Sequence, residues 1–280
     1  MVLGWHALGN LLALASSNDA YTHILLITPI VAGFIYLEWA AVRSSIAPGW
    51  REGTILLLTS ALIAGLAKWK ASLLGSDVQL SICTLAIVLW WIGAFVGCFG
   101  TRVSKSLFFP LCFLLWLIPL PTFLLDAIVA FLQRGSAYTA QLLFNAAGVP
   151  VMQDGIRVSI PGLTVEVAQE CSSIRSSMFL LVTTMVLAQL FLHSTWRKAF
   201  VDAMVVPLSL AKNGLRIFTI AMLGTRVDPG FLTGKLHHNG GVIFLAIALL
   251  AIFLLLWLLR DEKGQRTDET FRPMISAARK

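Results

Sequence analysis

Long apolar runs alternate with short polar connections along most of this chain. A helix needs about 20 apolar residues to cross a bilayer core about 30 Å thick, so runs of this length indicate transmembrane spans. The pattern predicts seven spans, near residues 20–42, 54–74, 80–100, 107–125, 173–192, 199–222 and 240–259. We therefore expect an all-α polytopic membrane protein.

Two stretches leave the number of transmembrane helices between seven and eight. The apolar run at residues 1–16 is too short to cross a bilayer comfortably. Within residues 107–148, prolines break the helix, so residues 123–144 either return as a second span or lie at the membrane surface. These prolines are Pro110, Pro119 and Pro121. We favour seven spans and keep eight as the alternative.

A different periodicity appears between the fourth and fifth expected spans. Residues 149–167 alternate apolar and polar positions around two dipeptides that favour turns, Asp154-Gly155 and Pro161-Gly162. This pattern predicts a small β-hairpin or meander standing on the membrane. Its last strand leads into Glu170 and Cys171, and then into the next span.

Composition agrees with a lipid environment for most of the chain. Of the 280 residues, 58% are hydrophobic and 12% are charged, and the mean hydropathy is +0.83. Soluble domains carry about a quarter charged residues, and no polar stretch here is long enough to form one. We predict a single membrane-embedded domain at residues 1–260 and a basic cytoplasmic tail at 261–280.

The net charge of +7 predicts orientation rather than nucleic-acid binding, because the basic residues sit in short loops and the tail and form no single basic face. If seven spans alternate, most basic groups fall on one side, which is then cytoplasmic. Its loops contain Arg43, Arg51, Arg102, Lys105, Arg197 and Lys198. Lys68 and Lys70 oppose this assignment, because they lie near the outer end of the second expected span. We expect a multi-pass protein of the cytoplasmic (inner) membrane, with residues 148–170 and 224–239 facing the outer, periplasmic side.

One cysteine differs from the other three in its surroundings. Cys83, Cys98 and Cys112 lie in apolar runs, where a thiol is usually a packing residue. Cys171 instead belongs to a polar cluster at the start of a transmembrane helix, where unpaired N–H groups and the helix dipole lower the pKa of a thiol. A capped helix start with an incidental cysteine is the alternative interpretation.

The neighbours of Cys171 act on its ionisation in opposite directions. Ser172 is a candidate N-cap of the helix that follows. Glu170 raises the pKa of an adjacent thiol unless a cation compensates it, and Arg175, one turn further on, is a candidate for that cation.

Two further polar groups are expected at the same membrane boundary as Cys171. Arg216, with Asn213 one turn before it, lies inside the sixth span, where a guanidinium is costly and usually marks a functional site, although it also fits an arginine that snorkels to the interface. His237 and His238 open the last span. A thiolate, an imidazole and a guanidinium together suffice for acyl transfer through a thioester. Lys212 we interpret as snorkelling or pairing with Asp202.

Taken together, these residues resemble the exosortase/archaeosortase family. The similarity covers about residues 109–244 and includes the Pro119-Leu120-Pro121 break, the hairpin, Glu170-Cys171-Ser172-Ser173-Ile174-Arg175-Ser176, Asn213-x-x-Arg216 and His237-x-x-x-Gly241.

The resemblance implies a membrane cysteine peptidase or transpeptidase with a Cys, Arg, His triad. Its substrates are membrane-anchored exported proteins with a C-terminal sorting signal that contains a Pro-Glu-Pro-like motif. Carried over by position, the nucleophile is Cys171, the arginine is Arg216 and the histidine is His237, which fits the spacing to Gly241 better than His238 does. Ser173 departs from the glycine usual in the family, which puts the substrate preference in doubt.

Two other functions compete with this interpretation. A transporter or assembly factor for exported polysaccharide would use Arg216 and the histidines to line a conduit and would not need Cys171. A membrane acyltransferase with a histidine base would leave Cys171 and the hairpin unexplained. For the peptidase we expect no cofactor, no metal and no nucleic-acid partner. We expect it to be embedded in the lipid bilayer.

Overall fold

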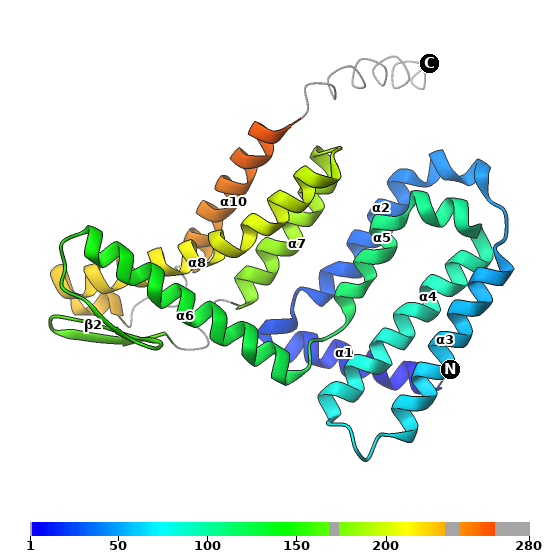
Figure 1. The fold of residues 1–280 in the computed structure, drawn as a ribbon, viewed down its shortest axis with the longest axis horizontal. Coiled ribbons are helices and arrows are strands. Elements are labelled where there is room, and N and C mark those ends of the chain that lie inside the picture. Colours follow the sequence, from blue (N-terminus) through cyan, green and yellow to red (C-terminus); the bar gives the residue numbers. More distant parts are fainter. Residues whose placement is uncertain (1, 168–173, 233–240, 261–280) are drawn as a thin grey trace. The chain divides into compact units, whose positions relative to one another are not determined.

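The computed structural model describes residues 2–167, 174–232 and 241–260 and is predominantly helical (Figure 1). The chain divides into two compact units, Met1–Ile128 and Val129–Lys280, and the division falls inside helix α6. Each unit has its own packed interior.

The first unit is built from helices joined by short 3-10 turns. Its helices are α1 (Val2–Ser17), α2 (Ile24–Val42), α3 (Trp50–Trp69), α4 (Ser76–Ser106), α5 (Phe108–Phe113) and the beginning of α6 (Thr122–Ala146). The turns are η1 (Asp19–Tyr21), η2 (Arg43–Ser45) and η3 (Leu114–Leu117).

Helices α3 and α4 pack closely because glycines line their contact. A Cβ added at Gly53 would lie 2.6 Å from the Cα of Gly97, and one added at Gly93 would lie 2.9 Å from the Cβ of Leu56. Small residues let membrane helices approach until their backbones touch. Ser60 adds a buried hydrogen bond across the pair, donating to the Ala86 carbonyl at 2.6 Å.

The proline-rich break expected after residue 107 is real and is held by specific hydrogen bonds. The segment Phe108–Leu117 and helix α6 meet at 96°. The Tyr21 hydroxyl donates to the Leu120 carbonyl at 2.8 Å, and the Ser81 hydroxyl donates to the Pro119 carbonyl at 2.7 Å. The Asp77 carboxylate accepts the backbone N–H of Thr122 at 2.8 Å and so caps the start of α6. The run at 107–125 is therefore not one straight helix.

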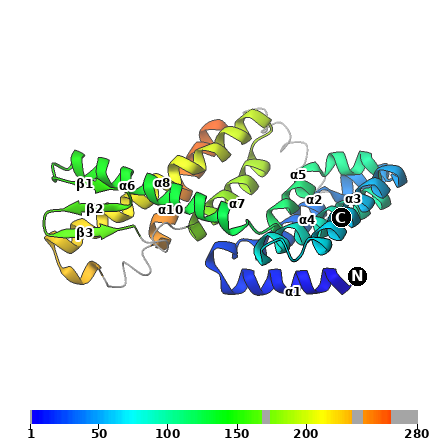
Figure 2. The same ribbon diagram turned by 60° about the horizontal axis from the view of Figure 1, so that its bottom comes forward.

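In the second unit, three short strands form an antiparallel meander, as the alternating pattern predicted (Figure 2). The strands are β1 (Met152–Asp154), β2 (Arg157–Ile160) and β3 (Leu163–Glu166), in the order β1-β2-β3. Gly155 (φ 60°) and Gly162 (φ 84°) occupy the two turns with positive φ, which glycine adopts without a steric penalty. The predicted hairpin is confirmed.

One face of this sheet is apolar and packs on helices α6 and α8. Val158 and Ile160 of β2 are buried, and Leu163 and Val165 of β3 are partly buried beside them. The helices contribute a set of apolar side chains to the same cluster, namely Ala137, Ala140, Phe144, Ile217 and Ala221. The other face is polar, with Arg157 paired to Glu166 at 3.0 Å. This packing fixes β3 against the helix that carries Arg216.

Three helices form the rest of the second unit: α7 (Ile174–Phe191), α8 (Thr195–Arg226) and α10 (Gly241–Leu259). A 3-10 turn, η5 (Pro229–Leu232), follows α8. Each helix packs against the other two through apolar residues such as Leu180, Val205 and Ile252. The Arg197 guanidinium donates to the Leu259 carbonyl at 2.8 Å, so the beginning of α8 meets the end of α10.

The described part of the chain has the properties of a polytopic membrane protein. Six of its helices are long and apolar enough to cross a bilayer, or seven if the bent pair Phe108–Leu117 and Thr122–Ala146 counts as one span. Large apolar side chains are exposed along these helices, including Leu62 (63%), Leu250 (69%) and Trp257 (65%). Such exposure suits lipid as the solvent. The all-α membrane fold with a small β-meander is confirmed.

Candidate functional site

Arg216 lies in the second half of α8 and is half-buried. One turn earlier, the Asn213 amide is 2% exposed and donates to the Ser136 hydroxyl of α6 at 2.9 Å. Glycines bring the two helices close, since a Cβ at Gly214 would lie 2.6 Å from the Cβ of Thr139. The backbone around Arg216 is thus held by buried contacts.

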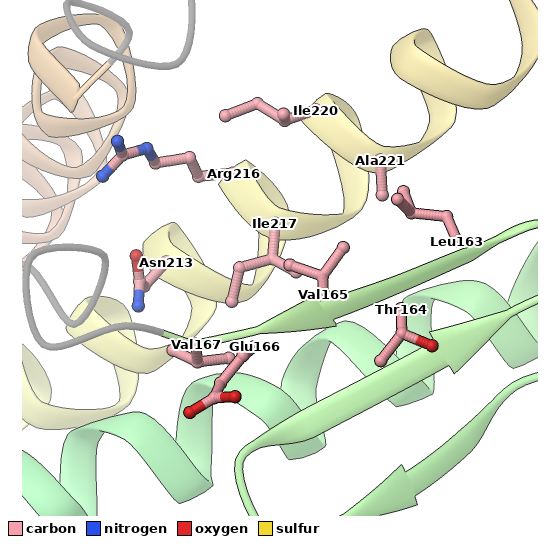
Figure 3. Close-up of a pocket in the computed structure, with 10 residues that line it drawn as sticks. All are labelled: Leu163, Thr164, Val165, Glu166, Val167, Asn213, Arg216, Ile217, Ile220 and Ala221. Carbon is pink, nitrogen blue, oxygen red and sulfur yellow. The ribbon is translucent and has the colours of Figure 1, made fainter. Parts of the chain in front are cut away.

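The Arg216 guanidinium lies beside the start of α10. A Cβ added at Gly241, the first residue of that helix, would lie 4.0 Å from Nη1 of Arg216. Figure 3 shows the side chain of Arg216 leaving α8 on the side opposite to Val165 and pointing toward α10. Gly241 is the glycine of the His237-x-x-x-Gly241 pattern. The structure therefore brings Arg216 to the helix end that follows the histidine pair.

Arg216 and Arg197 mark the two ends of the three-helix group. Arg197 contacts the end of α10, and Arg216 lies near its beginning. The 19 residue steps between them span about 28 Å of helix, close to the thickness of a bilayer core. An arginine at each end of such a segment is placed to reach a membrane interface.

Lys212 is buried, which contradicts its interpretation as a snorkelling residue or a partner of Asp202. It is 6% exposed, and its ammonium donates to the Ser176 hydroxyl in the first turns of α7. Oδ1 of Asp202 is buried without a hydrogen-bond partner in the described structure. One turn of α8 separates Lys212 from Arg216, so the contact with Ser176 ties the start of α7 to the helix that carries Arg216.

A cavity of about 250 Å³ lies between β3 and α8. Its wall on the strand side consists of Leu163, Thr164, Val165, Glu166 and Val167. Its wall on the helix side consists of Asn213, Arg216, Ile217, Ile220 and Ala221 (Figure 3). The lining is thus mainly apolar, and its polar residues are Asn213 and Arg216 on the helix side and Thr164 and Glu166 on the strand side.

Most of the predicted site residues lie outside the described part of the chain. These are Glu170, Cys171, Ser172, His237 and His238. Of the others, Arg175 is exposed in the first turn of α7, while Asn213 and Arg216 line the cavity. The described structure therefore brings together Asn213 and Arg216, and the triad as a whole stays a prediction.

The residue before the cysteine-bearing segment has a fixed position. The Val167 carbonyl accepts a hydrogen bond from the buried Gln133 amide at 2.7 Å, and its N–H donates to the Ile156 carbonyl at 3.0 Å. Val167 also lines the cavity with Arg216. Cys171 follows Val167 by four residue steps, and an extended chain covers at most about 14 Å in that length. Val167, the last described residue before this segment, thus lies on the same cavity as Arg216.

The sequence interpretation missed two polar residues of α6 that support the site. Gln133 anchors Val167 and Ser136 anchors Asn213, and both side chains are buried. Their spacing of three places them on one face of the helix, and this was the available signal.

The described residues contain no group of three His, Cys, Asp or Glu side chains that could hold a metal ion. Cys83, Cys98 and Cys112 are free thiols.

Comparisons with known proteins identify the family of the chain. No curated protein and no solved structure gave a match. A family model described as transmembrane exosortase (Exosortase_EpsH) matches residues 15–254, which is most of the chain. The match covers most of each compact unit and every described part of the candidate site. The chain therefore belongs to the transmembrane exosortase family.

Proposed function

We propose that this chain is a cysteine peptidase or transpeptidase that cleaves C-terminal sorting signals of membrane-anchored exported proteins through a thioester. Family membership supports a membrane transpeptidase or protease role in broad terms. The proposed signals contain a Pro-Glu-Pro-like motif followed by an apolar span and a basic tail. The proposed nucleophile is Cys171, with Arg216 as the oxyanion-binding group and His237 as the acid.

The position of Arg216 is the observation that carries the proposal. Its guanidinium is held at one end of the α7, α8 and α10 group, beside an apolar cavity and 4.0 Å from a Cβ position at Gly241. The chain enters this region at Val167, four residues before Cys171, and starts α10 four residues after His237. Short connections on both sides thus favour a meeting of the three groups.

The proposed reaction has two steps. The Cys171 thiolate attacks the scissile carbonyl, and Arg216 stabilises the negative charge that develops on its oxygen. The C–N bond then breaks, a proton from His237 goes to the departing amine, and a thioester to Cys171 remains. Water or a nucleophilic acceptor then attacks the thioester and gives its proton to His237, the C–S bond breaks, and the thiolate is restored.

Neighbouring residues have supporting roles in this scheme. Asn213, through its hydrogen bond to Ser136, fixes the turn of α8 that carries Arg216. Ser172 caps the helix that follows the nucleophile, and Arg175 either compensates Glu170 or attracts an acidic substrate residue. His238 neighbours the acid. The site is proposed to face the periplasmic side of the inner membrane, with the basic tail at 261–280 in the cytoplasm.

Trapping the acyl-enzyme tests the proposal. The purified protein in lipid nanodiscs is incubated with a substrate that carries a tag on the N-terminal side of its sorting signal. We expect a covalent adduct that hydroxylamine releases and that peptide mass spectrometry assigns to Cys171. Cys83, Cys98 and Cys112 are changed to alanine in every sample, so that Cys171 is the one thiol left in the chain. Low temperature slows the attack of water or an acceptor on the thioester, so that the adduct accumulates. Cleavage without any thiol-linked adduct under these conditions would contradict the thioester route.

A further inference from the structure

The outer edge of β3 is unpaired within the described structure. The sheet has the order β1-β2-β3, so β3 (Leu163–Glu166) has β2 as a neighbour on one side and no described strand on the other. An unpaired strand edge presents backbone N–H and C=O groups that another extended chain can bind.

The register of the sheet tells which backbone groups face this edge. Ile160 pairs with Leu163 across the two-residue turn, so these two residues form a hydrogen-bonded pair, and the next such pair is Val158 with Val165. The N–H of Val167 continues this alternation by donating to the Ile156 carbonyl. The N–H and C=O groups of Thr164 and Glu166 therefore point away from β2.

The cavity follows this same edge. Side chains of successive strand residues point to opposite faces of a sheet, so a cavity on one face would touch every second residue. Here five consecutive residues, 163 to 167, line the cavity. This is expected of a space that runs along the edge of the strand, and Figure 3 shows β3 passing below the turn of α8 that carries Ile217.

We propose that the substrate binds as an added strand on the edge of β3. The occupant is the extended peptide segment of the sorting signal, which accepts from and donates to the backbone groups of Thr164 and Glu166. Two residues along an extended chain cover about 6.6 Å in both partners, so the outward groups of Thr164 and Glu166 match every second residue of the peptide. This inference rests on the proposed function and names how its substrate is recognised.

Strand addition also explains the position of the cavity relative to Arg216. Arg216 and the edge of β3 line the same cavity, so a peptide aligned with β3 passes beside Arg216. The peptide's apolar side chains pack against Ile217 and Ile220 of α8. Backbone hydrogen bonds hold the peptide extended, and this conformation exposes the scissile carbonyl to the groups that react with it.

Proline substitution tests the role of the edge. Thr164→Pro removes one outward N–H and leaves the bonds from β3 to β2 intact, whereas Thr164→Ala keeps the N–H and removes the side chain. The matched control is Gln153→Pro, which removes the outward N–H of β1 on the opposite edge of the same sheet.

With purified protein and a sorting-signal peptide, we expect Thr164→Pro to raise KM about fivefold to tenfold. Thr164→Ala, which keeps the N–H, should raise KM less than Thr164→Pro does, and Gln153→Pro should stay within about twofold of the parent protein. Equal KM values for the two proline variants would overturn the proposal.

A scan of the substrate gives an answer even if the proline variant fails to fold. Peptides N-methylated at successive positions of the extended segment lose one N–H at a time. On the unmodified protein, we expect alternate positions to weaken cleavage, because only every second N–H of an added strand faces β3. Uniform effects, or none, would overturn strand addition. Absence of any cleavage of the unmethylated peptide would instead count against the proposed function itself.

Discussion

Of the three proposed catalytic residues, Arg216 is the one that lies in the described part of the chain. Its planar guanidinium offers a fixed fork of donors toward an oxyanion, which a lysine ammonium cannot reproduce. We expect Arg216→Lys to lower the rate of substrate cleavage about 100- to 1000-fold, the usual cost of losing an oxyanion donor. Arg197→Lys is the control, since it changes the same residue type at the other end of α8. Both rates are measured on purified protein with a tagged substrate. Retention of full activity by Arg216→Lys would exclude an oxyanion role.

The histidine pair gives a second prediction at the scale of single residues. His237 fits the spacing to Gly241, and the Arg216 guanidinium lies beside Gly241. We expect His237→Ala to abolish processing of a sorting-signal substrate and His238→Ala to leave most of it. The measurement is the fraction of substrate shortened in cells with matched amounts of each variant. The reverse result would assign the acid to His238, and equal tolerance of both changes would remove histidine from the mechanism.

Single residues also show where sequence reasoning fails. The cost of a guanidinium inside a span pointed to Arg216, which lines the cavity between β3 and α8, and its catalytic role stays a prediction. The snorkelling interpretation was wrong for Lys212, because a long lysine side chain can reach a neighbouring helix as easily as the membrane interface. Its burial against Ser176 depends on the packing of α7 on α8, which no local pattern specifies.

At the scale of elements, the turns and the helices differ in how much their sequences predict. Asp154-Gly155 and Pro161-Gly162 predicted the two turns of the meander, since positive φ at a glycine is a local requirement. The ends of the spans were less certain. Helix α6 continues to Ala146 as one helix, and its buried Gln133 and Ser136 face partners that lie far away in the sequence.

The contact between α3 and α4 gives a prediction about stability. A Cβ at Gly53 would meet the backbone of Gly97 at 2.6 Å, whereas a Cβ at Gly65 has no atom within 4 Å in the described structure. We expect Gly53→Ala to lower the free energy of unfolding by about 1–3 kcal/mol, typical of overpacking. Gly65→Ala on the same helix should cause no loss. Unfolding in mixed micelles measures both, and equal stability of the two variants would contradict the close packing of the helices.

At the scale of the whole molecule, hydropathy predicted most of the spans. Six long helices occupy the apolar runs, and the prolines at 119 and 121 explain why the remaining run is bent by 96°. The cavity between β3 and α8 was not predictable, because it forms between a strand and a helix that lie about 50 residues apart. Orientation in the membrane stays a prediction from the distribution of charges.

Labelling of single cysteines tests this orientation. Asp154→Cys lies at the end of β1, and Ser194→Cys lies between α7 and α8, and both positions are exposed. In intact cells treated to permeabilise the outer membrane, we expect a membrane-impermeant maleimide to label Asp154→Cys. Ser194→Cys should react only after lysis. The native cysteines are replaced by alanine in both proteins. Labelling of both sites from outside, or of Ser194→Cys alone, would contradict the predicted topology.

The central claim is that Cys171 carries the acyl group of the substrate. The most direct measurement is the fraction of a tagged sorting-signal substrate that is shortened in cells producing Cys171→Ala at the abundance of the unaltered protein. Cys112→Ala is the matched control, because it removes a thiol from an apolar part of the chain. The account predicts no processing by Cys171→Ala and normal processing by Cys112→Ala, since a thioester requires the sulfur. Full processing by Cys171→Ala would contradict the peptidase mechanism.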